Sequence, residues 1–285
     1  MQSIESMNII VLNLGHAETV HHWGNKDISS PFIRIYYVKK GRAVLHMAGN
    51  DMEITPGHMY LLPGYTPHSY ECDPEFEFYY LFIFQRNNNA FKVFDYYEFP
   101  IEVKTNTATQ LLFENYCELY PQLSLPAMNA EDFDRHPSYY DYAQAYMKMA
   151  AYERLQLNGL VEILFSYFLK HSTPKVVATD EPFQKLIDYI SSHINEPITV
   201  EQLADKACLT KSYLIRAFRK VMGVTPLQYI IRKKIQRAQA MLLSTNAPVH
   251  EIASALGFED TSYFIRIFKK NIGFTPQEYR VKLIG

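Results

Sequence analysis

The chain of 285 residues contains few cysteines and no long hydrophobic run. Its 3 cysteines (Cys72, Cys117 and Cys208) are scattered without a Cys-x-x-Cys pair. This arrangement excludes a disulfide framework and predicts free thiols in a reducing compartment. The sequence contains no run of roughly eighteen apolar residues, so it predicts no membrane span. The amino-terminal stretch has no basic region ahead of its apolar residues, which argues against export. We therefore expect a cytoplasmic protein without a membrane partner.

Charged and aromatic residues are divided unevenly along the chain. Residues 1–174 carry 12 Lys and Arg against 20 Asp and Glu, a balance of −8, whereas residues 175–285 carry 16 against 10, a balance of +6. The first part also holds 17 of the 22 tyrosines and the single tryptophan. An acidic part joined to a basic part indicates two separate tasks and makes a polyanion a candidate partner of the second.

The first part has the pattern of short strands followed by helices. Between about residues 9 and 85, runs such as FIRIYYV and AVLHM are separated by turn sequences, which favours an antiparallel sandwich or barrel. From 105 to 171 the pattern becomes helical. An apolar stripe runs along the end of this segment: Leu157, Leu160, Leu164 and Phe168. Two prolines without helical periodicity make 172–182 the predicted linker.

The basic part contains one sequence pattern twice. SYLIRAF (212–218) recurs as SYFIRIF (262–268), and the Gly-x-Thr-Pro sequence at Gly223 recurs at Gly273, both after fifty residues. Each copy predicts a short helix, a tight turn and a second helix, which is the helix-turn-helix pattern, at about 199–222 and 248–272. Capping boxes are expected to begin helices at three pairs: Thr199–Gln202, Thr225–Gln228 and Thr275–Glu278.

The second helix of each copy has a basic outer face. Helical spacing of about 100° per residue puts the apolar residues of both repeats on one side and directs Arg216 and Arg266 away from it. A helix of this kind fits the major groove of DNA, where arginine can bond guanine with two donors. Neighbouring cations are predicted to contact phosphates: Lys211, Arg219, Lys220, Lys269 and Lys270.

Two alternatives remain for these basic residues. A helical repeat whose basic face only meets water would carry the same charges, and a protein–protein adaptor would show no salt-dependent affinity for DNA. Between the two copies, a further basic cluster faces either phosphate or solvent: Arg232, Lys233, Lys234 and Arg237.

Residues 183–285 resemble the DNA-binding domain of the AraC/XylS family of bacterial transcription regulators. The resemblance rests on ITVEQLADKACLTKSYLIRAFRKVMGVTPLQYI and VHEIASALGFEDTSYFIRIFKKNIGFTPQEYR. It implies two helix-turn-helix units on double-stranded promoter DNA and recruitment of RNA polymerase. By position it implies a set of base-reading residues: Ser212, Ile215, Arg216, Ser262, Tyr263 and Arg266. Ile215 departs from the polar residue often found at its position, which leaves the operator sequence open.

Residues 1–104 resemble the cupin-like sensor domain of the same family, on the stretch PGHMYLLPGYTPHSY (56–70). The resemblance implies a small-molecule effector inside the barrel, and by family analogy a carbohydrate. Candidate ligand-binding side chains are aromatic or polar, although each could equally be ordinary packing: Trp23, Arg34, Tyr36, His68, Tyr70 and Tyr79. The helical segment 105–171, chiefly its part 138–171, either packs against a second copy in a homodimer or covers the barrel of its own chain.

The sequence thus predicts an α+β multidomain protein. An antiparallel β-barrel or sandwich of cupin type with a helical segment is followed by an all-α domain at 183–285. The predicted function is a sequence-specific transcription regulator controlled by a small molecule, with no catalytic residue, metal or other cofactor. The alternative is a metal-dependent cupin enzyme with an accessory helical module. That chemistry needs two or three converging imidazoles and a carboxylate, whereas the chain lacks a His-x-His pair.

Overall fold

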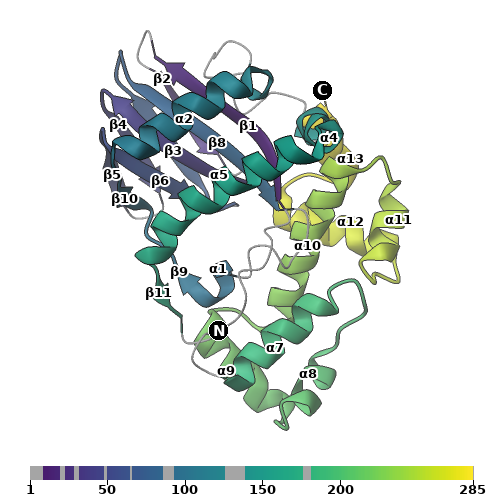
Figure 1. Cartoon of the computed structure of the whole chain (residues 1–285). Helices are drawn as coiled ribbons and strands as arrows, with labels where there is room; N and C mark the ends of the chain where they lie inside the picture. Colours follow the sequence, from purple (N-terminus) through teal and green to yellow (C-terminus); the bar gives the residue numbers. More distant parts are fainter. Residues whose placement is uncertain are drawn as a thin grey trace. The chain divides into compact units, whose positions relative to one another are not determined.

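The computed structural model of the chain describes residues 9–19, 23–28, 32–47, 50–64, 66–85, 93–125, 139–175 and 181–284. These residues form two compact units. The strand-rich unit consists mainly of Ile9–Gln85 and Phe99–Ser172, and the helical unit mainly of Thr173–Lys282 together with Arg86–Glu98. Within the described ranges, no helix combines the length and the apolar character needed to cross a membrane. Figure 1 gives the element labels.

The strand-rich unit contains two antiparallel sheets. One has the strand order β1-β8-β3-β6-β10, with bounds β1 (Ile9–Glu18), β8 (Glu77–Gln85), β3 (Ile33–Lys40), β6 (His58–Leu62) and β10 (Glu102–Lys104). The other has the order β2-β7-β4-β5, with bounds β2 (Trp23–Ile28), β7 (His68–Cys72), β4 (Ala43–Met47) and β5 (Asn50–Ile54). The predicted antiparallel sheet architecture is confirmed.

Helices cover the outer face of the five-stranded sheet. Phe113 of α2 (Thr107–Leu119) stacks on Tyr37 of β3, with ring centroids 5.9 Å apart. A 3₁₀ turn η1 (Pro121–Leu123) and helix α4 (Tyr139–Lys148) contact β1, and α5 (Ala151–Lys170) contacts β1 and β10. The α5 stripe at Leu157, Leu160, Leu164 and Phe168 is fully buried within this chain. The stripe therefore covers the chain's own sheet, as one of the two alternatives held.

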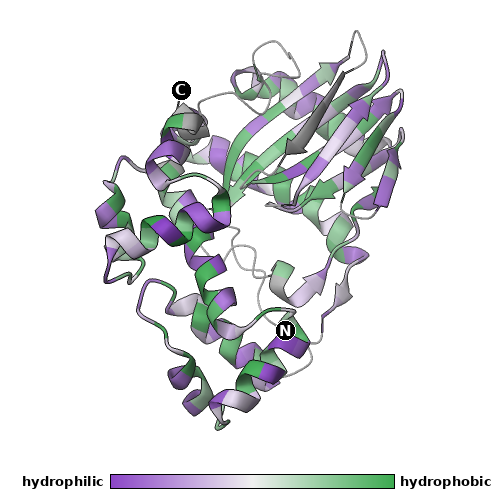
Figure 2. Cartoon of the chain, turned by 180° about the vertical axis from the view of Figure 1, so that it is seen from behind, coloured by the Kyte–Doolittle hydropathy of each residue, from purple (hydrophilic) through white to green (hydrophobic). Residues whose placement is uncertain are grey.

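The helical unit contains seven consecutive helices over residues 181–284. Their bounds are α7 (Glu181–Ser192), α8 (Val200–Lys206), α9 (Lys211–Met222), α10 (Pro226–Ser244), α11 (Val249–Ala255), α12 (Thr261–Ile272) and α13 (Pro276–Ile284). The capping boxes predicted at Thr199, Thr225 and Thr275 are present. In Figure 2 these helices carry both hydrophobic and hydrophilic stretches, which is typical of helices with one face in a core.

A short segment from the middle of the chain belongs to the helical unit. It comprises α1 (Val93–Tyr96) and β9 (Tyr97–Glu98), and β9 pairs with β11 (Thr173–Pro174). The Tyr96 ring lies in the same core cluster as Phe183 of α7 and Phe218 of α9, and only 4% of Tyr96 is exposed. Its hydroxyl donates to the Asp188 carboxylate at 2.9 Å. We call residues 93–98 the inserted segment, because the chain leaves β8 before it and enters β10 after it.

Candidate nucleic-acid interface and ligand pocket

The first helix-turn-helix unit consists of α8 and α9. The Thr210 hydroxyl caps α9 by accepting from the Tyr213 amide, and Gly223 ends the helix in the left-handed conformation at φ +73°. Between the helices the Leu209 amide donates to the Ala204 carbonyl at 2.9 Å. Ala204 is buried, as expected of a small residue where two helices cross closely.

The second unit, α11 and α12, repeats this geometry. Asp260 caps α12, and Gly273 ends it at φ +88°. The Phe258 amide donates to the Ala253 carbonyl at 3.0 Å, which is the bond of the first unit shifted by forty-nine residues. The ring pair Phe268–Tyr279 lies at 5.5 Å, as does the pair Phe218–Tyr229 in the first unit. The sequence repeat is therefore a structural repeat.

The two second helices expose equivalent side chains. Over SYLIRAF and SYFIRIF the burial sequence is identical: two exposed residues, one buried, one half-buried, one exposed, one half-buried and one buried. The exposed fifth residue is Arg216 in α9 and Arg266 in α12. Since the apolar residues Leu214, Phe218, Phe264 and Phe268 are fully buried, each helix is held by its inner face and presents its arginine outward.

Five of the six predicted base-reading residues are exposed, namely Ser212, Arg216, Ser262, Tyr263 and Arg266. Ile215 is half-buried and packs against the core of its unit. Its repeat equivalent is Ile265, whereas the equivalent of Tyr263 is Tyr213. Tyr213 is 53% exposed against 41% for Tyr263. Tyr213 is therefore a further candidate for the outward face of α9, and the fifty-residue offset in the sequence was enough to find it.

All five predicted phosphate contacts are exposed: Lys211, Arg219, Lys220, Lys269 and Lys270. Lys211 already pairs with the Glu201 carboxylate of α8, and this ammonium lowers the pKa of Glu201. Arg219 with Lys220 and Lys269 with Lys270 occupy the last turns of α9 and α12. Cations are favoured there by the helix dipole, so these pairs add positive charge at one end of each helix.

The basic cluster on α10 is not a single charged face. Arg232 is exposed, and Lys233 is half-buried with its ammonium 5.4 Å from the Tyr229 ring centroid. Lys234, however, is buried at 5% exposure. The expectation that Lys234 faces phosphate or solvent is therefore wrong, because α10 turns this position toward the interior of the helical unit.

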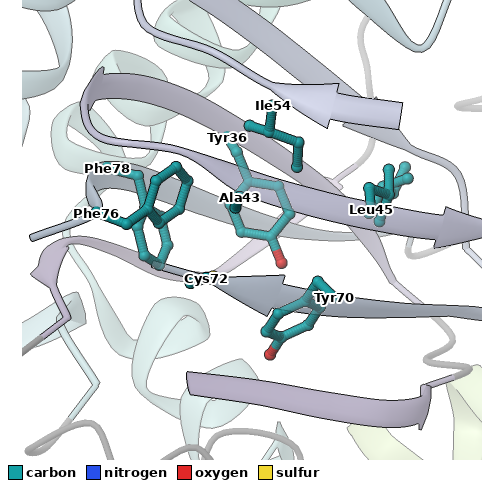
Figure 3. Close-up of a pocket in the computed structure, with 9 residues that line it drawn as sticks. Tyr36, Ala43, Leu45, Ile54, Tyr70, Cys72, Phe76 and Phe78 are labelled. Carbon is teal, nitrogen blue, oxygen red and sulfur yellow. The ribbon is translucent and has the colours of Figure 1, made fainter. Parts of the chain in front are cut away.

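A pocket lies between the two sheets of the strand-rich unit (Figure 3). It holds about 430 Å³ of empty space, its open mouth included. Both sheets contribute to the lining, which is aromatic and aliphatic: Tyr36, Ala43, Leu45, Ile54, Leu62, Tyr70, Cys72, Phe76 and Phe78. Burial raises the pKa of the Cys72 thiol to about 12, so this wall is uncharged near neutral pH.

Two predicted ligand-binding residues, Tyr36 and Tyr70, line this pocket. Arg34 and His68 lie two residues before them on β3 and β7, and so share the same inward faces. The Arg34 guanidinium donates to His68 Nε2 at 2.9 Å, while His68 Nδ1 lies 2.8 Å from the Thr66 carbonyl. Because that carbonyl can only accept, Nδ1 carries the proton and Nε2 accepts. Arg34 also contacts the Phe32 and Phe82 rings.

Of the other two predicted ligand-binding residues, Tyr79 does not line the pocket. Tyr79 lies on the opposite face of β8, where its hydroxyl donates to Glu114 of α2 at 3.3 Å and its ring contacts Phe113. Burial beside Glu114 raises the pKa of Tyr79. Trp23 lies on β2 opposite Cys72, and its side chain lies outside the described residues. Seven of the nine lining residues were not predicted from the sequence: Ala43, Leu45, Ile54, Leu62, Cys72, Phe76 and Phe78.

Histidines do not gather into a metal site in the part of the chain that the structure describes. No group of three or more His, Cys, Asp or Glu side chains there could hold an ion. His46 pairs with Asp51 at 2.8 Å. His58 Nδ1 donates to the Pro56 carbonyl at 3.1 Å and lies 3.3 Å from the Thr55 hydroxyl. These contacts are the ordinary partners of structural histidines.

Comparison with known proteins finds the same two parts. Residues 203–282 match the family described as a helix-turn-helix domain, and residues 16–125 match the AraC-like ligand binding domain. The regulatory protein SoxS of Salmonella typhimurium is 36% identical over 75 residues, which is 26% of this chain and 70% of that protein. The lactose operon transcription activator of Staphylococcus xylosus is 29% identical over 104 residues, 36% of this chain and 37% of that protein.

The matched segment thus spans little more than a third of the lactose operon activator. A fold likeness covers more of the chain. The structure of ToxT from Vibrio cholerae aligns with 98% of this chain and 100% of its own, with a TM-score of 0.52 and 14% sequence identity. At this identity the likeness concerns the architecture of a strand-rich part followed by a helical part.

Proposed function

Because this chain belongs to the AraC family of transcription regulators, we propose that it binds two adjacent DNA boxes through α9 and α12 and that a small molecule held between its two sheets controls this binding. The observation that carries the proposal is the identical exposure of the two repeats, with Arg216 and Arg266 at the same outward position. An adaptor or an inert repeat does not need matched arginines on two equally capped helices.

The spacing of the two helices supports paired boxes. Helix α10, which joins the units, has 19 residues and is therefore about 28 Å long at about 1.5 Å per residue. Successive major-groove faces on one side of DNA lie about 34 Å apart. We propose that Ser212, Tyr213 and Arg216 read one box, and that Ser262, Tyr263 and Arg266 read the other. The exposed cations at the ends of α9 and α12 would meet phosphates.

The lining of the pocket indicates the class of effector. Its polar groups are the phenols of Tyr36 and Tyr70 and the Cys72 thiol, and the remaining lining is hydrocarbon. A carbohydrate needs many hydrogen-bond partners to leave water, so the lining argues against the sugar suggested by family analogy and by the name of the lactose operon relative. We propose a largely apolar effector with one or two hydroxyl-bonding groups.

Partners beyond DNA follow from the same family. We propose that the chain recruits RNA polymerase at promoters in the bacterial cytoplasm, and that it acts as a homodimer. Since the inner stripe of α5 is used within the chain, the dimer surface would be the outer face of α5. Three large apolar residues are exposed there: Tyr152 at 66%, Leu155 at 73% and Ile163 at 46%.

A selection experiment tests the DNA-binding proposal. The full chain is incubated with a pool of randomised duplexes, and bound duplexes are amplified through several rounds. The expected result is one motif with two boxes about one helical turn apart, bound with an affinity that falls steeply as salt rises. A pool that stays random, or affinity that salt leaves unchanged, would contradict the proposal.

A further inference from the structure

Lys234 on α10 is a buried cation. It is 5% exposed, although lysine is among the residues least often buried unless its charge is compensated. Burial lowers the pKa of its ammonium, which is the expected cost of removing a charge from water. A side chain kept in such a position needs specific partners.

The partners of Lys234 come from the loop that precedes the first helix-turn-helix unit and from the turn of the second unit. Its Nζ donates to the main-chain carbonyl of Glu196 at 2.7 Å and to that of Leu256 at 2.7 Å. Glu196 lies in the loop that precedes α8, and Leu256 is the C-cap of α11. The carbonyls at the end of a helix carry partial negative charge. One ammonium on the connecting helix therefore joins two chain segments sixty residues apart.

The backbones of these two segments also touch directly. Gly257, next to Leu256, has φ +66°, and a Cβ there would lie 2.6 Å from the Glu196 carbonyl carbon and 2.8 Å from the Pro197 nitrogen. Both distances are shorter than real Cβ contacts, so only glycine allows this approach. The Lys234 ammonium also lies 5.2 Å from the Phe258 ring centroid. The turn of the second unit, the loop before the first and the connecting helix thus meet at one point.

We propose that Lys234 is a positioning residue that fixes the two helix-turn-helix units at one separation, so that the chain reads two DNA boxes at one spacing only. This inference rests on the proposed function. When two reading helices are held rigidly at the right distance, binding at the first box makes binding at the second effectively intramolecular. If the joint loosens, each helix still binds its own box, but the gain from linking them falls and the required spacing relaxes.

The experiment compares the wild-type chain with Lys234→Met, which keeps the length and apolar stem of the side chain and removes the ammonium. The probes are the two-box duplex selected by the wild type, the same duplex with one box scrambled, and versions with 2 or 5 extra base pairs between the boxes. Each affinity is measured by fluorescence anisotropy. Lys185→Met, at an exposed lysine of α7, is the matched control for loss of one positive charge.

For Lys234→Met, the ratio of two-box to one-box affinity is expected to fall by about tenfold or more, and the penalty for 5 inserted base pairs to shrink by a similar factor. One-box affinity should stay within about twofold of wild type, because the reading helices themselves are unchanged. Lys234→Arg should retain the wild-type ratio, since its guanidinium can donate to both carbonyls. Lys185→Met should change the affinity for the one-box and the two-box duplex by the same factor.

An unchanged ratio with an unchanged insertion penalty in folded Lys234→Met protein would overturn the inference, as would an equal loss on one-box and two-box duplexes. If Lys234→Met does not fold, Lys234→Gln takes its place, since its shorter amide cannot span both carbonyls, and the same outcomes decide. Failure of the proposed function looks different, because the wild type itself would then select no two-box duplex.

Discussion

Arg216 of α9 and Arg266 of α12 lie fifty residues apart in the sequence and occupy the same structural position, each exposed between two half-buried residues. This equivalence was predictable because it depends on local helical periodicity and on capping residues that can be identified in the sequence. Substitution of one of these arginines provides the first test of DNA reading.

We expect Arg266→Ala to weaken binding to the selected duplex by about tenfold to a hundredfold, corresponding to roughly 1–3 kcal/mol of base discrimination. Binding to random duplex should change little. Lys270→Ala is the control. Loss of a phosphate contact should weaken binding to the selected and to the random duplex equally and should reduce the salt dependence of binding. Anisotropy titrations at several salt concentrations measure both effects. Equal losses on selected and random DNA for Arg266→Ala would exclude base reading by this arginine.

The turns of the two units differ at one position, where φ is +53° at Cys208 and +66° at Gly257. A side chain in the left-handed region costs about 1–2 kcal/mol, and glycine loses about 0.5–1 kcal/mol of this gain through its freer unfolded chain. Cys208→Gly should therefore stabilise the chain by roughly 0.5–1 kcal/mol in urea unfolding, whereas Cys208→Ala should not. A Cys208→Gly chain less stable than Cys208→Ala would contradict this account of the turn.

Gly257→Ala should have the opposite effect. Its Cβ would meet the backbone of Glu196 and Pro197, neither of which can move as a flexible side chain would. We expect a loss of at least about 2 kcal/mol in the free energy of unfolding. Gly223→Ala provides the comparison, because it has a similar φ of +73° but no atom within 4 Å of the added Cβ. Equal losses at both glycines would show that backbone strain alone, without the close approach, determines the effect.

The cysteines should differ in reactivity with a thiol reagent at pH 8. Cys208 is exposed, whereas burial raises the pKa of Cys72 and of Cys117 to about 12. One fast-reacting thiol is expected in the folded chain, and Cys208→Ser should abolish it. The pKa values of Cys72 and Cys117 in the folded chain lie above the ordinary pKa of a thiol. The stability that these two buried thiols contribute is therefore fully present below the ordinary pKa and is lost as pH rises through about 12. Fast modification of Cys72 in folded protein would contradict a dry pocket wall.

The pocket can be tested before its effector is known. Ala43 lines it, while Val44 on the same strand points to the other face. Ala43→Leu should reduce binding of an apolar fluorescent dye by about tenfold through loss of pocket space, with Val44→Leu close to wild type. Fluorescence titration measures the dye affinity, and melting temperature confirms folding. Equal dye binding by both variants would place the dye elsewhere.

Sequence reasoning succeeded where the information is local. The helix caps at Thr199, Thr225 and Thr275, the glycine stops and the repeat itself each depend on residues a few positions apart. The side of β8 on which Tyr79 lies could not be predicted. The stretch FEFYYLFIF is apolar on both sides of the strand, so it shows no alternation of apolar and polar residues. A shift of one residue separates Tyr79, under α2, from Phe78, in the pocket.

The burial of Lys234 and of Tyr96 depends on contacts between distant parts of the chain. Lys234 lies among arginines and lysines, and only the approach of Glu196 and Leu256 makes it an interior residue.

The inserted segment has a practical consequence for anyone who wishes to isolate the DNA-binding part. A fragment cut in the predicted linker would lack Tyr96, and with it a buried ring of the α7–α9 core and the hydroxyl that bonds Asp188. Such a truncation would leave a cavity in the core that contains Phe183 and Phe218. It would also remove β9, the strand that pairs with Thr173 and Pro174. We therefore expect an excised domain to be more stable when residues 93–98 are supplied again, either as a fused extension or as an added peptide.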